Sequence, residues 1–122
     1  MTFRMRLREP EDDEAIAAIV EAAFGGRNEV QLVDALRRAG DMISECVALD
    51  AGGAVVGHVA FSRLQVASAE RNLRATALAP LAVLPDRQNQ GVGKALVHHA
   101  IGRLRDRGHD LIVVLGHPAY YA

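Results

Sequence analysis

A glycine-bearing loop between two apolar stretches constrains this fold more than any other part of the chain. Residues 86–97, DRQNQGVGKALV, contain two glycines two positions apart, followed by a lysine and by apolar residues at helical spacing. A strand that leads through such a loop into a helix leaves unpaired backbone N–H groups at a helix N-terminus, where negative charge is favoured. The stretch therefore predicts an anion site. The alternative is an ordinary helix start with a glycine-rich turn.

Two familiar phosphate-binding motifs do not fit this loop. A P-loop requires a glycine five residues before Gly93 and a serine or threonine after the lysine, but those positions are Gln88 and Ala95. A dinucleotide fingerprint requires a third glycine three residues after Gly93, where the chain has Leu96. The sequence thus argues against both of these nucleotide-binding folds.

Apolar periodicity divides the rest of the chain into strands and helices. Pro80 interrupts one apolar run, which predicts a bulge or an edge there instead of a regular central strand. Pro10 fits a helix start, Asn28 fits an N-cap, and glycines at 25 and 40 fit helix ends. The order is β-α-α-β-β-β-α-β, an α/β (α+β) fold, with strands at 4–9, 45–50, 54–66, 75–85 and 111–116 and helices at 10–24, 28–38 and after the loop.

Size and composition narrow the function. The 122 residues fit a single domain, 1–122, with one core. A net charge of -1 gives no sequence-wide basic excess, so no nucleic-acid partner is expected. No apolar run approaches the roughly 20 residues of a membrane span, and no secretory leader is evident. With Cys46 as the one cysteine and no metal-ligand spacing, we expect a cytoplasmic protein without a metal site.

The loop QNQGVG, Gln88 to Gly93, matches Q/R-x-x-G-x-G/A and resembles the acetyl-coenzyme A signature of the GNAT superfamily of N-acetyltransferases. The element order is also similar, and 78–97 with 113–121 resemble one bacterial branch of predicted acetyltransferases. The resemblance implies a mixed, mainly antiparallel central sheet flanked by helices, and acetyl-CoA as the cofactor. It also implies that the usual last helix and two strands are lacking. The strand 111–116 would then have an open edge, through which a homodimer could form.

The resemblance assigns the cofactor contacts to backbone groups. The pantetheine arm would pair, like an additional strand, with Leu81, Ala82 and Val83. The pyrophosphate would lie on the amides of seven consecutive residues: Gln88, Asn89, Gln90, Gly91, Val92, Gly93 and Lys94.

The implied reaction is direct attack of a primary amine, on a small molecule or a protein, on the acetyl thioester. The resemblance points to Tyr121, beside Tyr120, as the general acid for the leaving thiolate; a packing tyrosine is the alternative. No carboxylate or histidine lies in 75–83, so no base is visible there. Glu29, where the family shapes its acceptor site, is the leading candidate, with His58 and His117 behind it. A first-turn helix acid and a packed strand histidine are the alternatives for Glu29 and His58.

Two other functions remain open on the sequence. The missing C-terminal elements and the absent base favour a non-catalytic acyl-CoA-binding or regulatory protein. An interaction module that uses the open sheet edge and binds no coenzyme A is the other. The acceptor amine is not indicated by the residues.

Overall fold

The computed structural model describes residues 3–64, 75–108 and 111–114. Its five strands form one sheet in the order β1-β2-β3-β4-β5. The strands are β1 (Arg4–Leu7), β2 (Met42–Leu49), β3 (Val55–Leu64), β4 (Ala75–Val83) and β5 (Leu111–Val114). The helices are α1 (Asp13–Phe24), α2 (Asn28–Ala39) and α3 (Val92–Asp106), with two 3-10 turns, η1 (Pro10–Asp12) and η2 (Pro85–Arg87). The expected order of strands and helices is confirmed.

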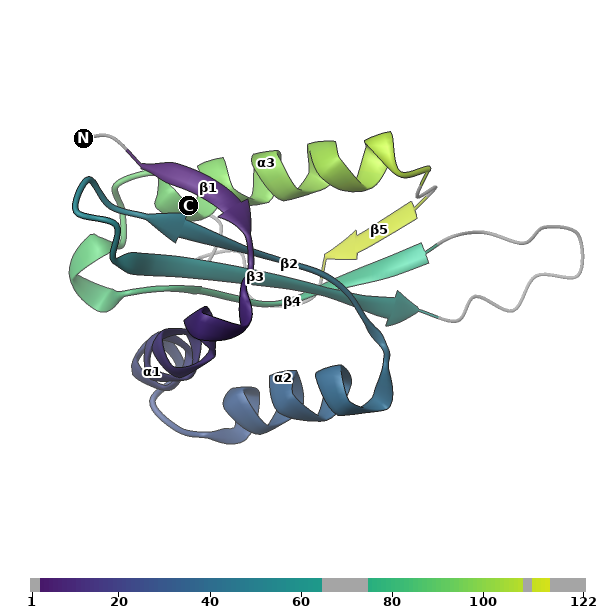
Figure 1. Ribbon diagram of the computed structural model, residues 1–122, viewed down its shortest axis with the longest axis horizontal. Helices are drawn as coiled ribbons and strands as arrows, with labels where there is room; N and C mark the ends of the chain where they lie inside the picture. The colour runs from purple at the N-terminus through teal and green to yellow at the C-terminus, as the bar shows by residue number, and fades with distance from the viewer. Residues whose placement is uncertain (1–2, 65–74, 109–110, 115–122) are drawn as a thin grey trace, which may run out of the picture.

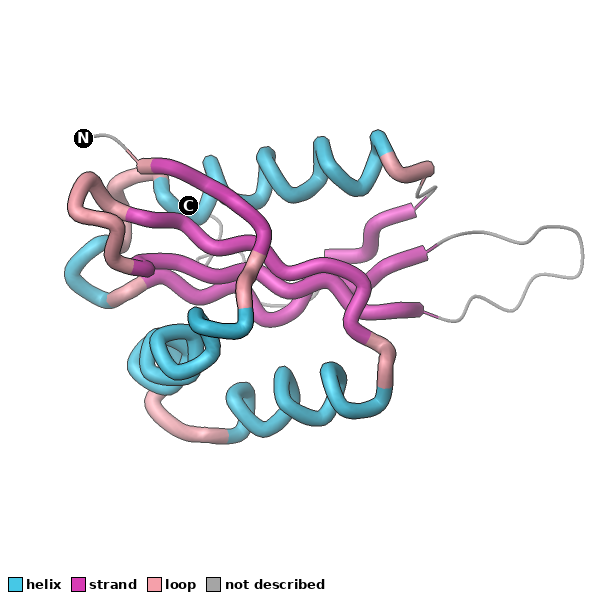
Figure 2. The backbone as a smooth tube through the Cα atoms, in the orientation of Figure 1, coloured by secondary structure: helices cyan, strands magenta, loops and turns pink. Residues whose placement is uncertain are grey.

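The sheet separates two helical layers. Helix α3 covers one face, while α1 and α2 cover the other (Figure 1). The same layering is visible when the backbone is coloured by secondary structure (Figure 2). The core on the α3 face contains Cys46, Ala48, Val56, Val59, Phe61, Leu78, Leu81, Val83, Val92, Leu96, Ala100 and Leu104. The core on the opposite face contains Ile16, Ile19, Val20, Val30, Val47, Leu49 and Ala82.

The sheet is mixed and mainly antiparallel, as expected. Strands β1 to β4 pair antiparallel with their sequence neighbours. Strand β5 pairs with β4 in parallel, after the crossover through α3, from Ala75↔Leu111 to Leu78↔Val114. Parallel neighbours need a long crossover connection, and α3 provides it here by packing on the sheet.

Strand β4 bulges at Pro80, as its sequence predicts. On β3, Val59 and Phe61 are two positions apart, while their partners Leu81 and Leu78 are three apart on β4. The extra residue falls at Ala79–Pro80, whose peptide bond is cis. A bulge relieves the ladder of the N–H that proline lacks and bends the strand locally.

Two helix starts differ from the expectation. Arg27, not Asn28, occupies the N-cap position of α2, and no side chain caps that helix. Pro10 begins the η1 turn, and α1 follows only at Asp13. Both helices end as predicted, at Gly25 (φ 73°) and Gly40 (φ 75°), in the left-handed conformation that glycine adopts without strain.

Candidate functional site

The loop between β4 and α3 presents a helix N-terminus to solvent. Asn89 (φ 63°) and Gly91 (φ 82°) are both left-handed, and Gly91 is the N-cap of α3. The first helical bond is that of the Ala95 amide to the Gly91 carbonyl, 3.0 Å. No side chain caps the helix, so the amides of residues 92–94 have no partner within the described part of the chain. These amides are donors without acceptors.

Side chains within the loop brace it. The Gln88 side-chain amide donates to the Val83 carbonyl, 3.1 Å, which ties the loop to the end of β4. The Gln90 side chain donates to the Asp86 carbonyl, 3.3 Å. An ion pair of 3.6 Å between Arg87 and Asp50 connects the η2 turn to the β2–β3 hairpin. The amides of α3 are therefore held at a defined position.

The predicted pantetheine edge lies directly before this loop. Leu81, Ala82 and Val83 pair on one side with β3. On the other side, the pairing of β4 with β5 ends at Leu78 within the described residues. The side chains of Leu81, Ala82 and Val83 are buried, so this edge has only backbone groups to offer. The edge and the free amides of α3 belong to one stretch of the chain, residues 81–94.

A glycine on β3 sets the height of α3 above the sheet. A Cβ on Gly57 would lie 3.2 Å from Val92 Cγ1 and 3.4 Å from both Ala48 Cβ and Leu96 Cδ2. A side chain at this position would be in tighter contact with Val92 than is usual, because the space between β3 and the N-terminus of α3 is already filled. Sequence reasoning missed Gly57, although an isolated glycine inside a strand pattern often marks such a close approach.

A buried ionic cluster lies on the α1/α2 face of the sheet, and sequence reasoning missed it as well. Glu45, with a side chain 4% exposed, accepts hydrogen bonds from Arg37 Nε (2.9 Å) and Nη2 (2.7 Å). Its Oε1 also lies 2.8 Å from His58 Nε2. Arg8 lies 3.9 Å from Glu45 and is paired with Asp13 through two contacts of 2.6 Å. The sequence did contain a signal for this cluster: Glu45 and His58 are ionisable residues within otherwise apolar strands.

The cluster fixes the protonation of its members. Burial raises the pKa of Glu45, but the hydrogen bonds from Arg37 and His58 outweigh it, and the pKa falls to about 2. Burial lowers the pKa of His58 more than the Glu45 carboxylate raises it. At neutral pH the carboxylate is therefore ionised and the imidazole is neutral.

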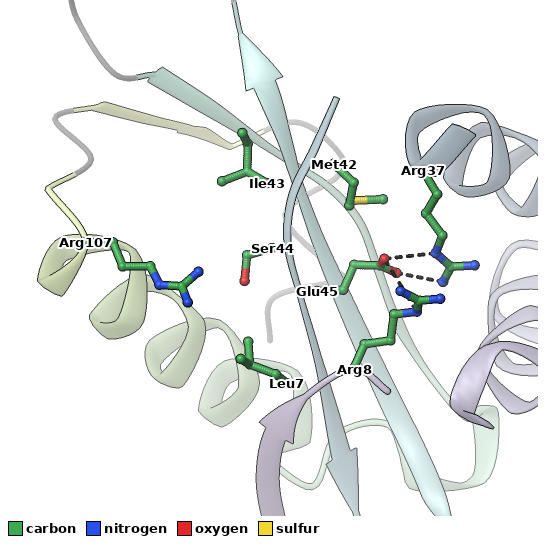
Figure 3. Close-up of a pocket in the computed structure, with 8 residues that line it drawn as sticks. All are labelled: Leu7, Arg8, Arg37, Met42, Ile43, Ser44, Glu45 and Arg107. Atoms are coloured by element: carbon green, nitrogen blue, oxygen red, sulfur yellow. Dashed lines mark hydrogen bonds and ion pairs between the residues drawn. The ribbon is translucent and has the colours of Figure 1, made fainter. Parts of the chain in front are cut away.

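A pocket of about 310 Å³ adjoins this cluster at the start of β2. Figure 3 shows Glu45 between Arg37 and Arg8, with Arg107, the residue that follows α3, on the opposite side of the pocket. Arg8 and Arg37 are already paired with carboxylates, so their charge is neutralised within the protein. The pocket lies at the C-terminal end of α3, whereas the free amides lie at its N-terminus.

The predicted catalytic residues are dispersed or undescribed. Glu29 is the second residue of α2, partly exposed, in the first-turn position of an ordinary helix acid. Tyr121, Tyr120 and His117 lie outside the described residues. Within the described ranges, no group of three or more histidine, cysteine, aspartate or glutamate side chains is placed to hold a metal. No helix there is long and apolar enough to cross a bilayer.

A family model for an acetyltransferase (GNAT) domain matches residues 4–122. The chain belongs to this GNAT family. Two Escherichia coli (strain K12) N-acetyltransferases are relatives of this GNAT chain. YhbS is 35% identical over 118 residues, which are 97% of this chain and 70% of YhbS. YjhQ is 33% identical over 122 residues, 98% of this chain and 66% of YjhQ.

Two crystal structures share the GNAT fold at similar identity. YhbS from Escherichia coli in complex with CoA has a TM-score of 0.88 at 34% identity, over 98% of this chain and 65% of that chain. A GNAT family acetyltransferase from Brucella melitensis in complex with acetyl-CoA has a TM-score of 0.87 at 35% identity. The match covers 98% of this chain and 79% of that chain. The chain thus spans about two thirds of the length of YhbS.

Proposed function

We propose that this chain transfers an acetyl group from acetyl-CoA to a primary amine, on a small molecule or a protein, by direct attack of the amine on the thioester. One observation carries the proposal: free amides at the start of α3 directly follow a strand edge that offers only backbone groups, residues 81–83. Proteins 34% and 35% identical, with the same fold, bind CoA and acetyl-CoA.

The pyrophosphate is proposed to lie on the amides of residues 88–94. Charge-assisted hydrogen bonds of this kind contribute about 1.5–3 kcal/mol each. The helix dipole adds roughly 0.3–1 kcal/mol. Lys94, exposed in the first turn of α3, supplies a positive charge beside the same amides. The pantetheine arm is proposed to continue the sheet along Leu81, Ala82 and Val83.

The chemistry requires two proton movements. A lysine-like amine at pH 7 must lose a proton at a cost of about 4.6 kcal/mol, because its pKa is near 10.4. The departing thiolate, with a thiol pKa near 8.5, leaves readily and is helped by a general acid. We propose Tyr121 as that acid and Glu29 as a residue of the acceptor site. We also propose that the chain forms a single domain, is located in the cytoplasm and forms a homodimer through the edge of β5.

Calorimetric titration with acetyl-CoA tests the binding site. We expect wild-type protein to bind with a Kd on the order of micromolar, and Gly91→Asp to weaken binding at least tenfold, because its carboxylate would repel the pyrophosphate. Gly40→Asp is the matched control: Gly40 is also left-handed, with open space around its Cβ, but it lies at the end of α2. A folded wild-type protein that binds no acetyl-CoA would overturn the proposal.

Turnover is tested by release of free coenzyme A with a panel of primary amines and a thiol reagent. Cys46 is fully buried, so the protein contributes little background. Binding without turnover of any amine would favour the alternative, a non-catalytic acyl-CoA-binding protein. That alternative draws on the absence of a carboxylate or histidine from β4.

A further inference from the structure

The Glu45–His58 pair leaves one imidazole nitrogen as an unused proton acceptor. An ionised carboxylate only accepts hydrogen bonds, so the 2.8 Å contact requires that His58 Nε2 carries the proton. In the neutral ring the lone pair then lies on Nδ1. A carboxylate that fixes the tautomer of a histidine in this way is the arrangement by which enzymes prepare an imidazole to take a proton.

His58 Nδ1 has no hydrogen-bond partner among the described residues. The whole side chain is 0% exposed, and Nδ1 is buried with it. Buried polar atoms are nearly always hydrogen-bonded, so an orphan calls for a ligand or an ordered water. Glu45, which holds this ring, is itself held by Arg37 on α2 and lies 3.9 Å from Arg8, which follows β1. Asp13 on α1 is paired in turn with both arginines.

The register places this acceptor beside the proposed acyl arm. His58 on β3 is the direct partner of Ala82 on β4, and directly opposed residues lie on the same face of the sheet. Ala82 is the middle residue of the proposed pantetheine edge. The bulge at Ala79–Pro80 lies two residues earlier on the same strand. His58 is thus one strand away from the edge along which the thioester would lie.

Burial, more than the surrounding charges, keeps the His58 ring neutral. Burial lowers the pKa of His58; Glu45 opposes this effect, while Arg37 and Arg8 add to it. A protonated ring would place an unpartnered Nδ1–H in the core, which is costly. The ring therefore rests in the neutral form, with the Nδ1 lone pair available as an acceptor.

This inference rests on the proposed function. We propose that His58 Nδ1 accepts, through one bridging water, the proton that the acceptor ammonium loses before it attacks the thioester, and that Glu45 orients the ring. The free amine then forms the C–N bond, the C–S bond breaks, and the sulfur takes a proton from the general acid. The general acid is restored by the second proton of the amine nitrogen. His58 releases its proton to solvent, so amide, free thiol and one proton are formed.

Nitrogen-15 NMR of the histidine rings tests the proposal without an acceptor amine. With His58→Gln to assign the signals, we expect His58 at pH 7 in the neutral form protonated at Nε2. Saturating acetyl-CoA should shift its Nδ1 resonance, and should leave the exposed His98 on α3 unchanged. A ring protonated at Nδ1, or a Nδ1 resonance that ignores bound acetyl-CoA, would overturn the proposal.

The pH profile of kcat/KM gives a kinetic readout that a structural role would not change. With an amine from the panel that wild type acetylates, we expect kcat/KM to rise with pH through one ionisation. His58→Gln should lower kcat/KM by 100-fold or more and remove that ionisation, with the Kd for acetyl-CoA unchanged. His98→Gln should behave as wild type. If wild type binds and turns over but His58→Gln keeps the rate and profile, this inference fails and the proposed function stands.

Discussion

Gly57 on β3 lies directly beneath Val92, the first residue of α3, and a Cβ at Gly57 would come 3.2 Å from Val92 Cγ1. Because Gly57 on β3 has no side chain, the start of α3, with the free amides of residues 92–94, can lie close to the sheet. Stability and cofactor binding should respond together when this contact changes.

Gly57→Ala should therefore lower both the stability of the fold and the affinity for acetyl-CoA. The added methyl group meets the buried side chains of Val92, Ala48 and Leu96 at 3.2–3.4 Å, so these neighbours must give way by a few tenths of an ångström. Overpacking of a filled core typically costs about 1–3 kcal/mol. We expect a decrease of that size in the free energy of unfolding in denaturant titrations, and weaker binding of acetyl-CoA in calorimetry.

Gly102→Ala provides the control on the same helix. Gly102 lies within α3, and a Cβ there meets no atom within 4 Å. Alanine should stabilise the helix by up to about 1 kcal/mol and leave acetyl-CoA binding unchanged. Equal behaviour of the two variants would contradict the role assigned to Gly57.

Glu45→Gln should be strongly destabilising. The change removes from the Arg37 guanidinium, whose side chain is mostly buried, its one buried carboxylate partner and leaves only longer contacts of 3.5 Å to Asp13 and Asp34. Removal of one partner from a buried ion pair typically costs about 3–5 kcal/mol. Asp34→Asn removes a second carboxylate 3.5 Å from the same guanidinium, but at an exposed position, and should change stability by less than about 1 kcal/mol. Urea titration of both variants checks the contrast.

Stability should fall in acid in two stages. The folded protein holds the pKa of His58 below its ordinary 6.5, so the unfolded chain binds the proton first, and stability decreases as the pH falls below 6.5. The pKa of Glu45 is lowered from 4.5 to about 2, so a second decrease follows between those values. For Glu45 it amounts to about 3 kcal/mol. Unfolding titrations at a series of pH values would show both stages.

The Glu45 part of the second stage should be absent from the Glu45→Gln variant. A smaller decrease should remain, because the hydrogen bond from Arg6 also lowers the pKa of Asp12. A wild-type protein whose free energy of unfolding is constant from pH 7 to pH 3 would contradict both assignments.

Tyr121→Phe tests the proposed general acid. Loss of the phenol should lower kcat by about 100-fold or more, with acetyl-CoA binding retained, because general acid catalysis commonly contributes that much. Tyr120→Phe removes the neighbouring hydroxyl and should leave kcat nearly unchanged. If Tyr121→Phe retains full activity, the acid is another group.

Local patterns in the sequence were sufficient for much of the fold. The loop at 86–97 predicted the start of α3, because the glycines that mark a helix N-terminus are recognisable within a few residues. Pro80 likewise predicted the bulge in β4, because proline lacks the backbone N–H that a regular strand pairing requires. The cap of α2 was wrong because Arg27, not Asn28, takes the N-cap position.

The ionic cluster and the contact at Gly57 could not be predicted in the same way. Glu45 and His58 meet only because β2 and β3 pair in one particular register, and Arg37 reaches them from a separate helix. The need for glycine at position 57 arises only from its contact with Val92, which lies 35 positions later in the chain. Both depend on contacts between distant residues, which strand and helix periodicity does not encode.

The coincidence of sheet order with chain order bears on how the molecule assembles. Strands β3 and β4 can each add to the preceding strand through a connection without a helix, which keeps the entropy of loop closure small. Strand β1 can pair with β2 only after α1 and α2 between them have formed, and β5 must wait until α3 has crossed over the sheet. Until then the outer edge of β4 is an open template for unwanted strand pairing between molecules. A cofactor that occupies residues 81–83 would therefore also act as a guard against aggregation of the newly made protein.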